Sequence, residues 1–308
     1  MISTVMSVYN EKIEWVREAV YSIINQTYKN WELIIIIDNP NLDRCVDDFL
    51  KMVNKSDDRI RLLYNSKNIG LAESLNIGIL KAKGEYIARM DADDVAIPTR
   101  FERELNFIKE QNVDMVSTNA IFIDENSKEI KKGSKLEKNP EKKLLFTNMI
   151  IHPSVLMKKE AVDKLGGYRN FRKSQDYDLW LRMLSYGMQI RCMDEYLMKY
   201  RIRVSSLSTS CRLEQYYYNL YQKKLYRERK HKGVDSFSEK NLNDFINQKQ
   251  ITEEKNIKCI ECMKLLDEAK ERLIKKDILF ISFWIKALKK FPSITINSSL
   301  NMLHKLFI

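Results

Sequence analysis

Cysteine is scarce in this sequence, and its distribution excludes a disulfide-stabilised secreted domain. The 308 residues include five cysteines, an odd number scattered along the chain. This usage is typical of proteins of the reducing cytoplasm. The closest pair, Cys259 and Cys262, has no second pair and no histidine near it. We therefore interpret it as two positions on one helix rather than as a zinc or redox site.

Long apolar runs and targeting signals are also missing. No stretch approaches the roughly 20 apolar residues that are needed to span a bilayer. Residues 1–8 lead directly into a strand pattern, without the basic leader and cleavage site of a signal peptide. These features predict a cytoplasmic protein.

Positive charge, by contrast, is abundant and unevenly placed. The net charge is +11, and most of the excess lies in the last third of the chain. From Arg212 to the C-terminus there are 20 lysines and arginines against 12 acidic residues, a surplus of 8. Such a surplus favours nucleic acid, anionic lipid or a polyanionic substrate as partner. Because no motif of a nucleic-acid-binding module is present, we expect no nucleic-acid partner.

Over the first two hundred residues, short β-branched runs alternate with helical patterns. This alternation predicts an α/β domain with a mainly parallel sheet and crossover helices. The run from Leu33 to Ile37 is apolar at every position, as expected of a central strand covered on both faces. The predicted elements are strands over residues 2–8, 32–37, 60–64, 86–90, 115–123 and 152–158, and helices over 11–25, 71–81, 100–111 and 174–186.

The pattern changes after about residue 124. Residues 124–140 are polar and charged, which predicts an exposed hairpin or loop. From about Cys211 onward the sequence is helix-rich and basic, with almost no strand signal. We therefore predict two domains, an α/β domain over residues 1–210 and a helical, basic extension over residues 211–308.

Three carboxylates stand close together in the segment Asp91-Ala92-Asp93-Asp94, directly after a predicted strand. They repel one another unless a cation compensates them, and oxygen-rich clusters of this kind suit Mg²⁺ or Mn²⁺. The alternative is an acidic turn that caps the helix opened by Pro98, since helix starts favour aspartate. Spacing alone leaves both interpretations open.

Two further loops are expected at the same edge of the sheet, because ligands of open parallel sheets bind beyond the carboxyl ends of the strands. Residues 7–11 follow the first strand and include Tyr9, and Asp38 follows the second strand. The ring of Tyr9 offers a face on which a nucleobase could stack. Asp38 could accept a hydrogen bond from an N–H group of that nucleobase, and the acidic segment could hold a metal that binds the phosphates. Together these features favour a nucleotide-diphosphate site.

Six segments of the chain occur together, and in this order, in one enzyme family. The segments are residues 6–11, 22–33, 68–78, 82–94, 152–155 and 175–182. On these motifs, residues 1–205 resemble a family 2 glycosyltransferase with the GT-A fold. The resemblance implies a Rossmann-like α/β domain with a mainly parallel sheet and flanking helices. It does not cover the helical C-terminal extension, which is predicted from its composition alone.

The resemblance implies a role for each matching residue. Tyr9 would lie against the base, Asp38 would accept from the uracil, and Asp91 would face the ribose and diphosphate. Asp93 would ligate the metal together with Asp91, and Asp176 would be the catalytic base. The other expected site residues are Ser7, Glu11, Asn68 and Ala92 for the nucleotide sugar, and Asp94, His152, Gln175 and Asp178 as accessory or acceptor-side groups, with Asp178 as rival for the base.

The chain departs from the family pattern at several positions. Ile37 stands where many relatives have a second aspartate, and Gln175 where the family usually has glutamate. No arginine precedes Asn76 in the helix that would position the diphosphate. A structural alternative also exists for Asp176, as an aspartate that stabilises a helix dipole, and for His152, as a structural histidine.

The expected activity is that of a metal-dependent inverting glycosyltransferase with Mn²⁺ or Mg²⁺ as cofactor. It would move a sugar from a nucleotide diphosphate, with a UDP-sugar favoured, to a hydroxyl of a growing surface glycan or lipid-linked glycan, such as capsule, exopolysaccharide or lipopolysaccharide. The alternative is a non-catalytic GT-A-fold protein that docks on a partner or membrane. Residues 215–230 and 278–290 combine aromatic or apolar side chains with cations, so they could contact the inner face of the cytoplasmic membrane or simply pack.

Overall fold

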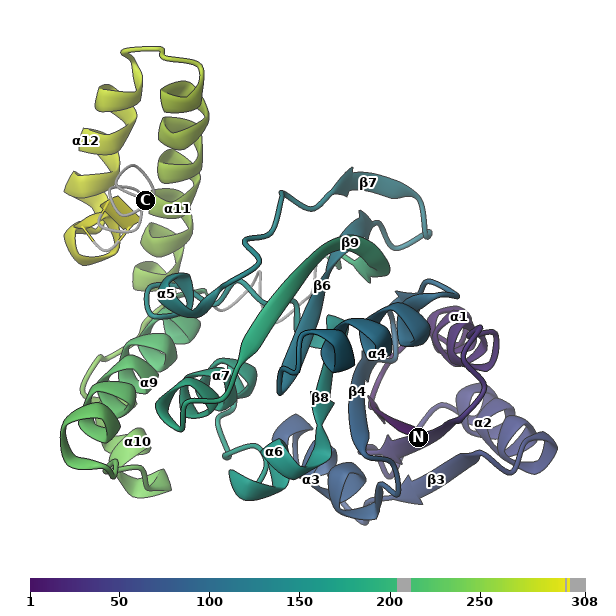
Figure 1. Cartoon of the computed structure of the whole chain (residues 1–308). Helices are drawn as coiled ribbons and strands as arrows, with labels where there is room; N and C mark the ends of the chain where they lie inside the picture. Colours follow the sequence, from purple (N-terminus) through teal and green to yellow (C-terminus); the bar gives the residue numbers. More distant parts are fainter. Residues whose placement is uncertain (204–211, 297, 300–308) are drawn as a thin grey trace. The chain divides into compact units, whose positions relative to one another are not determined.

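The computed structural model describes residues 1–203, 212–296 and 298–299 (Figure 1). The chain divides into two compact units, Met1–Arg203 and Val204–Ile308. The first unit contains all the strands found among the described residues, and the described part of the second contains helices. The domain boundary predicted after residue 210 lies outside the described residues.

One nine-stranded sheet organises the first unit. Its order is β3-β2-β1-β4-β8-β6-β9-β5, and β7 pairs with β6 beside this path. The pairs among the first four strands are all parallel, as predicted. The pairs that β8, β7 and β5 form are antiparallel, so the complete sheet is mixed. The strands are β1 (Ile2–Val8), β2 (Trp31–Ile37), β3 (Ile60–Tyr64), β4 (Tyr86–Asp91), β5 (Val95–Ala96), β6 (Met115–Ile123), β7 (Glu129–Lys132), β8 (Val155–Lys158) and β9 (Ile190–Arg201).

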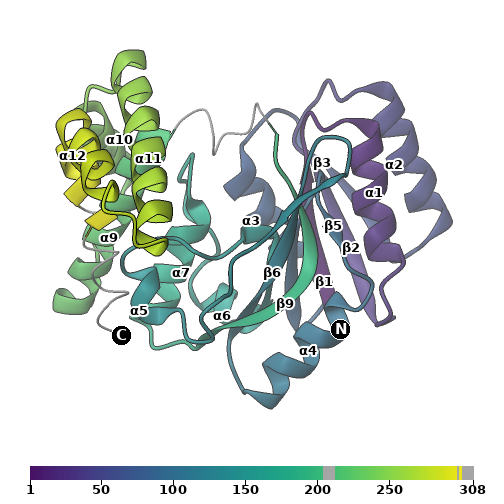
Figure 2. The same ribbon diagram turned by 90° about the horizontal axis from the view of Figure 1, so that it is seen from above.

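Helices cover both faces of the parallel strands. Figure 2 shows α1 and α2 on one side of β1 and β2, and α3 on the other. Alternate residues of β2 serve the two layers: Ile35 belongs to the core that α1 and α2 share, whereas Ile36 lies against Gly78 of α3. The helices are α1 (Ile13–Ile24), α2 (Arg44–Ser56), α3 (Leu71–Lys81), α4 (Arg100–Glu110), α5 (Glu141–Leu144), α6 (Lys159–Lys164), α7 (Gln175–Ser185) and the 3₁₀-helix η1 (His152–Ser154).

The structure differs from the predicted elements in several places. The strand predicted from residue 152 begins only at Val155, because Pro153 cannot donate to a ladder and the preceding residues form η1 instead. Helix α2, the short helix α5 and the strands β5 and β9 were not predicted at all. The polar segment after β6 forms the predicted hairpin, with β7 antiparallel to β6.

The second unit is built from α9 (Arg212–Lys232), α10 (Glu239–Asn247), α11 (Glu253–Ile274) and α12 (Phe280–Lys290). Cys259 and Cys262 both lie on α11 and are fully buried in its core, together with Leu266 and Ala287. Burial raises the pKa of the Cys259 thiol to about 11, which fits the interpretation as packed helix positions. Within the described residues, no helix combines the length and the apolar character that crossing a bilayer requires.

Candidate active site

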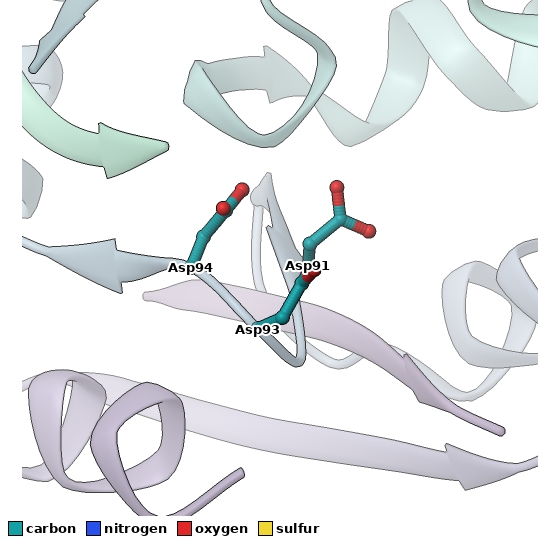
Figure 3. A group of neighbouring side chains, drawn as sticks. All are labelled: Asp91, Asp93 and Asp94. Atoms are coloured by element: carbon teal, nitrogen blue, oxygen red, sulfur yellow. The ribbon is translucent and has the colours of Figure 1, made fainter. Parts of the chain in front are cut away.

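The acidic residues predicted to bind a metal lie on the turn that joins β4 to β5 (Figure 3). β4 ends at Asp91, and β5 follows directly after Asp94. Asp91, Asp93 and Asp94 each offer one carboxylate oxygen, and these oxygens all lie within 4.8 Å of one another. Helix α4 begins only at Arg100, with Thr99 at its N-cap. The aspartates therefore do not cap this helix, and the helix-cap interpretation is wrong.

Two arginines compensate part of the charge on this acidic turn. The guanidinium of Arg89, which is 2% exposed, pairs with Asp91. Arg203 Nε lies 2.9 Å from Asp93 Oδ2. Burial and the neighbouring carboxylates raise the pKa of Asp93 to about 6 and the pKa of Asp94 well above its usual value. Three close carboxylates thus face two guanidinium groups, so the turn suits a further cation.

The end of β9 holds the acidic turn in shape. Arg201 donates its backbone N–H to Asp94 Oδ1 at 2.8 Å and its Nε–H to the Asp93 carbonyl at 2.7 Å. The pairing of Val95 with Lys199 brings β9 alongside the turn. A strand that the sequence did not predict therefore shapes the predicted metal site.

The oxygen ligands on the turn fit a hard divalent cation. Carboxylates are preferred ligands of Mg²⁺ and Mn²⁺. Asp94 Oδ2 is buried and accepts no hydrogen bond from the described residues, a situation that is unfavourable unless a cation or a proton compensates it. Asp91, Asp93 and Asp94 are thus the residues that could hold a metal. Ala92, 2% exposed within the same turn, could reach a nucleotide only through its backbone.

The loop after β1 lies beside the acidic turn. Ser7 is the strand partner of Asp91 in the parallel pairing of β1 with β4. Glu11 Oε2 accepts the backbone N–H of Tyr9 at 2.7 Å, and the charge of Glu11 contributes to the raised pKa of Asp93. The Tyr9 side chain is 43% exposed and so accessible to a ligand. The structure thus brings Ser7, Tyr9 and Glu11 to the same strand ends as the acidic turn.

Asp38 lies after β2 and organises the loop that leads into α3. Its carboxylate accepts hydrogen bonds from Asn65 Nδ2 at 2.8 Å and from the backbone N–H groups of Ile69 and Gly70, both at 2.9 Å. The exposed Asn68 accepts from the same Gly70 N–H at 3.0 Å. A contact between Asp38 and a uracil stays a prediction, and it would use the acceptor capacity that these bonds leave.

Asp176 and Asp178 share the first turn of α7 but have different surroundings. Asp176 accepts a hydrogen bond from Asn148 Nδ2 at 2.7 Å, and burial raises its pKa. Asp178 is fully buried, and its Oδ2 lies 2.7 Å from Arg182 Nε. Residues two apart do not share a helix face, so the ion pair leaves Asp176 as the better candidate for the base. Gln175, 7% exposed, begins the helix beside it.

His152 lies on η1 among aromatic side chains. Its Nε2 is 2.8 Å from the Tyr168 hydroxyl, and its ring centroid lies 6.0 Å from that of Trp180. Burial, helped by the positive charge of Arg89, holds the pKa of His152 well below its usual value. The imidazole is therefore neutral at neutral pH and already has a partner, as the structural alternative requires. A role towards an acceptor stays a prediction.

Arg89 links the two halves of this candidate site. Its charge interacts with Asp91 and also opposes part of the rise that burial causes in the pKa of Asp176. The antiparallel pairing of β8 with β4, with Leu156 opposite Ala88, brings η1 to the same strand end. The acidic turn and Asp176 therefore lie within electrostatic range of one buried guanidinium. Sequence reasoning missed Arg89, although an arginine inside an apolar strand was a signal that could have found it.

A second residue that sequence reasoning missed is Tyr168, which Asn76 of α3 holds in place. The Asn76 side chain accepts the Tyr168 backbone N–H at 2.7 Å and donates to the Tyr168 carbonyl at 2.8 Å. The chain can approach this closely because residue 167 is glycine: a Cβ there would lie 2.4 Å from Asn76 Oδ1. The motif asparagine of α3 therefore positions the hydroxyl that faces His152.

Comparison with known families identifies the chain. The model described as Glycosyl transferase family 2 matches residues 3–166, more than half of the sequence. The chain belongs to glycosyl transferase family 2. Both the family and the class of enzyme expected from the motifs are therefore confirmed.

Two relatives illustrate the range of this glycosyltransferase family. An uncharacterized glycosyltransferase, MJ1057 of Methanocaldococcus jannaschii, is 35% identical over 206 residues, which cover 66% of this chain and 71% of that protein. The O-antigen biosynthesis glycosyltransferase WbnJ of Escherichia coli is 36% identical over 213 residues, which cover 68% of this chain and 83% of that protein.

Solved structures of the protein TarS share the fold. TarS 1–349 of S. aureus in complex with UDP matches with a TM-score of 0.60 at 13% identity, over 97% of this chain and 91% of that one. The complex of the same protein with UDP-GlcNAc matches with a TM-score of 0.59 at 15% identity, over 80% and 70% of the two chains. At this identity the likeness speaks for the fold alone, and it confirms the expected GT-A fold with a helical C-terminal region.

Proposed function

We propose that this family 2 enzyme is a metal-dependent inverting glycosyltransferase that uses a UDP-sugar and extends a surface glycan. The observation that carries the proposal is the group of three carboxylates at the carboxyl end of β4, which bring one oxygen each within 4.8 Å of one another. This group lies close to the loop after β1 that contains Tyr9. The UDP and UDP-GlcNAc complexes of the similar TarS structures support the donor class. The names of two relatives, for O-antigen and amylovoran biosynthesis, support a surface glycan as product.

In this proposal Asp93 and Asp91 hold Mn²⁺ or Mg²⁺, with help from Asp94. When bound, the ion supplies Lewis-acid stabilisation of the negative charge that grows on a departing diphosphate, an effect worth several kcal/mol. The buried guanidinium of Arg89 pairs with Asp91 and compensates part of the negative charge of the turn. Tyr9 offers its exposed ring to the base.

Asp176 is the proposed general base. An acceptor hydroxyl attacks the anomeric carbon from the face opposite the diphosphate, and Asp176 takes the hydroxyl proton as the new C–O bond forms. The C–O bond to the diphosphate breaks, and its electron pair leaves with UDP, so the anomeric configuration inverts. The raised pKa of Asp176 makes this carboxylate a stronger base than an exposed aspartate.

The proposed location is the inner face of the cytoplasmic membrane, where a lipid-linked glycan acceptor would be found. The proposal is supported by the positive surplus of the C-terminal region and by the apolar, lysine-ended helix α12.

Calorimetric titration of the protein with UDP tests the metal assignment. The wild type should bind UDP in Mn²⁺ and bind it far more weakly after chelation. Asp93→Ala should lose the Mn²⁺-dependent part, whereas the control Asp48→Ala, which removes an exposed carboxylate of α2, should behave as wild type. Unchanged Mn²⁺-dependent binding by Asp93→Ala would refute the assignment. A thermal-shift screen of nucleotide sugars with and without Mn²⁺ would then identify the donor.

A further inference from the structure

The end of the α11–α12 hairpin exposes large apolar side chains. Figure 1 shows α11 and α12 side by side, joined by a short connection. Ile274 is 73% exposed, Ile278 75% and Leu279 53%. Ile281 and Ile285 continue the exposed surface along α12, at 44% and 42%. These five residues form what we call the hairpin tip.

The hairpin tip is not a poorly packed part of the core. Trp284, Ala287 and Phe291 belong to the hydrophobic cluster that α12 shares with Cys259 and Cys262 of α11. Ile281 and Ile285, four residues apart on α12, lie on a different side, so α12 already has a packed face and also presents a second apolar face to solvent. Clustered exposed apolar residues of this kind mark interaction sites.

Lysines surround the hairpin tip. Lys275, Lys276, Lys286 and Lys289 have no carboxylate within ion-pair distance among the described residues, although Lys286 Nζ lies 5.2 Å from the Phe283 ring. The acidic residue at the turn, Asp277, is paired with Arg272 at 2.7 Å. Lys275 also lies close enough to Asp277 to help lower the pKa of that carboxyl. The apolar tip is therefore bordered by four lysines, and the Asp277 carboxylate at the turn is already shared between Arg272 and Lys275.

One of these lysines occupies a position that normally favours glycine. Lys276 has φ +59° and ends α11 in a Schellman arrangement, in which its N–H bonds the Leu273 carbonyl at 3.0 Å and the Asp277 N–H bonds the Arg272 carbonyl at 2.9 Å. A residue with a Cβ is less stable than glycine in this conformation. The positive charge at the tip is thus present at a position where folding alone would favour glycine.

We propose that the hairpin tip inserts into the interface of a bilayer that contains anionic phospholipid. The inference deepens the proposed function, and it rests on the membrane location given there. α12 rises about 1.5 Å per residue, so Lys286 and Lys289 stand roughly 8–12 Å along the helix from Ile281. An interfacial helix buries its apolar face about 5–10 Å deep, so these long side chains can reach the phosphates while the isoleucines lie among the acyl chains.

Charge distinguishes this partner from a second copy of the chain. A symmetric contact through the hairpin tip would bring two sets of lysines together, and like charges across an interface are unfavourable. Anionic headgroups match both the apolar surface and its positive border. A self-association through the tip is therefore an outcome that the test must be able to detect.

Vesicle flotation of the full chain tests the proposal. The wild type should float with vesicles of phosphatidylcholine and phosphatidylglycerol, less with pure phosphatidylcholine, and less again at high salt. The double variant Ile278→Ser/Leu279→Ser should bind the anionic vesicles at least about tenfold more weakly. Leu80→Ser is the matched control, because Leu80 is 77% exposed on α3 of the first unit; it should float as wild type does.

Lys276→Gly separates charge from folding. Glycine suits the positive φ, so the variant should be as stable as the wild type or more stable, while its binding to anionic vesicles falls about fivefold. Equal flotation of the wild type and the Ile278→Ser/Leu279→Ser variant would overturn the proposal. So would a concentration-dependent dimer that this double variant abolishes, because the tip would then bind a second copy.

The calorimetric UDP titration distinguishes failure of this inference from failure of the proposed function. Tip variants that keep Mn²⁺-dependent UDP binding but lose vesicle binding support the inference. If the wild type binds UDP with Mn²⁺ and ignores anionic vesicles, the inference is overturned and the nucleotide-sugar chemistry stands. If the wild type binds vesicles through the tip without any affinity for UDP, the proposed function fails and the membrane surface stands.

Discussion

The acidic turn between β4 and β5 and the first turn of α7 both contain several aspartates, but the surroundings of these aspartates differ. On the acidic turn three carboxylates share a small volume, and Asp94 Oδ2 has no hydrogen bond from the described residues. On α7 the two aspartates are separated by the helix, with Asp178 paired to Arg182 and Asp176 bonded to one amide. The first arrangement suits a cation, and the second leaves a single buried carboxylate to accept a proton.

The difference shows how one class of side chain acquires two functions from its surroundings. Repulsion between close carboxylates can be relieved by an ion or a proton, so the acidic turn is a binding site by its charge. A lone buried carboxylate has a raised pKa because of burial, which makes it a base. Variants that exchange oxygen for nitrogen at single positions can test this division.

The largest expected effect is on catalysis. Asp176→Asn should lower sugar transfer, measured as UDP release from the donor, by about 10²–10⁴-fold, since the amide cannot take the proton. Mn²⁺-dependent UDP binding should persist, because the acidic turn is untouched. The control Asp163→Asn changes a half-exposed carboxylate of α6 and should keep full activity. Retained turnover in Asp176→Asn would move the base to another residue and remove the contrast between the two regions.

The next effect is on stability. Asp178→Asn should lower the free energy of unfolding by about 3–5 kcal/mol, because it leaves the buried guanidinium of Arg182 without its carboxylate. Denaturant unfolding measures this loss. The exposed pair of Glu254 with Lys258 on α11 is the control, and Glu254→Gln should change stability little. If Asp178→Asn instead folds normally and loses only activity, Asp178 belongs to the chemistry.

Much of the nucleotide side could be predicted because its signals are local. The fully apolar run of β2 predicts a central strand, and the acidic segment directly follows a strand pattern. Helix α2 carried a readable signal as well, with apolar residues at helical spacing behind the N-cap Asp43, and it was overlooked.

The remaining parts depend on contacts that the sequence does not display. Strand β9 was missed because the pairing with β6 shifts register between Thr118 and Ala120, which interrupts the alternation that marks a strand. The partners of the acidic turn, Arg89 and Arg201, come from a strand interior and from the end of that missed strand. Composition indicates positive charge but not which arginine is buried beside which carboxylate.

The acidic turn should be a source of instability without metal. The pKa of Asp93 is about 6 in the folded state instead of the usual 3.8. Its protonated form therefore stabilises the fold below about pH 3.8, and this stabilisation is lost as the pH rises through about 6. Asp93→Asn should therefore be about 1–3 kcal/mol more stable than wild type at neutral pH in a chelator. Adding Mn²⁺ should raise the melting temperature of the wild type only. A variant less stable than wild type in chelator would show that the turn is not strained by its charge.

The smallest expected effect is the contribution of His152 to the pH dependence of the unfolding free energy. The pKa of His152 is held well below its usual 6.5 by burial and by Arg89, so the unfolded chain binds the extra proton first as the pH falls. Stability linked to this group is therefore complete above about pH 6.5 and lost below it, by at most about 1.4 kcal/mol per pH unit. His152→Gln should flatten the dependence of unfolding free energy on pH between about 5 and 6.5, and the exposed His231→Gln should not. An unchanged slope would mean that His152 has the same pKa in the folded and the unfolded chain, so that neither burial nor Arg89 shifts it.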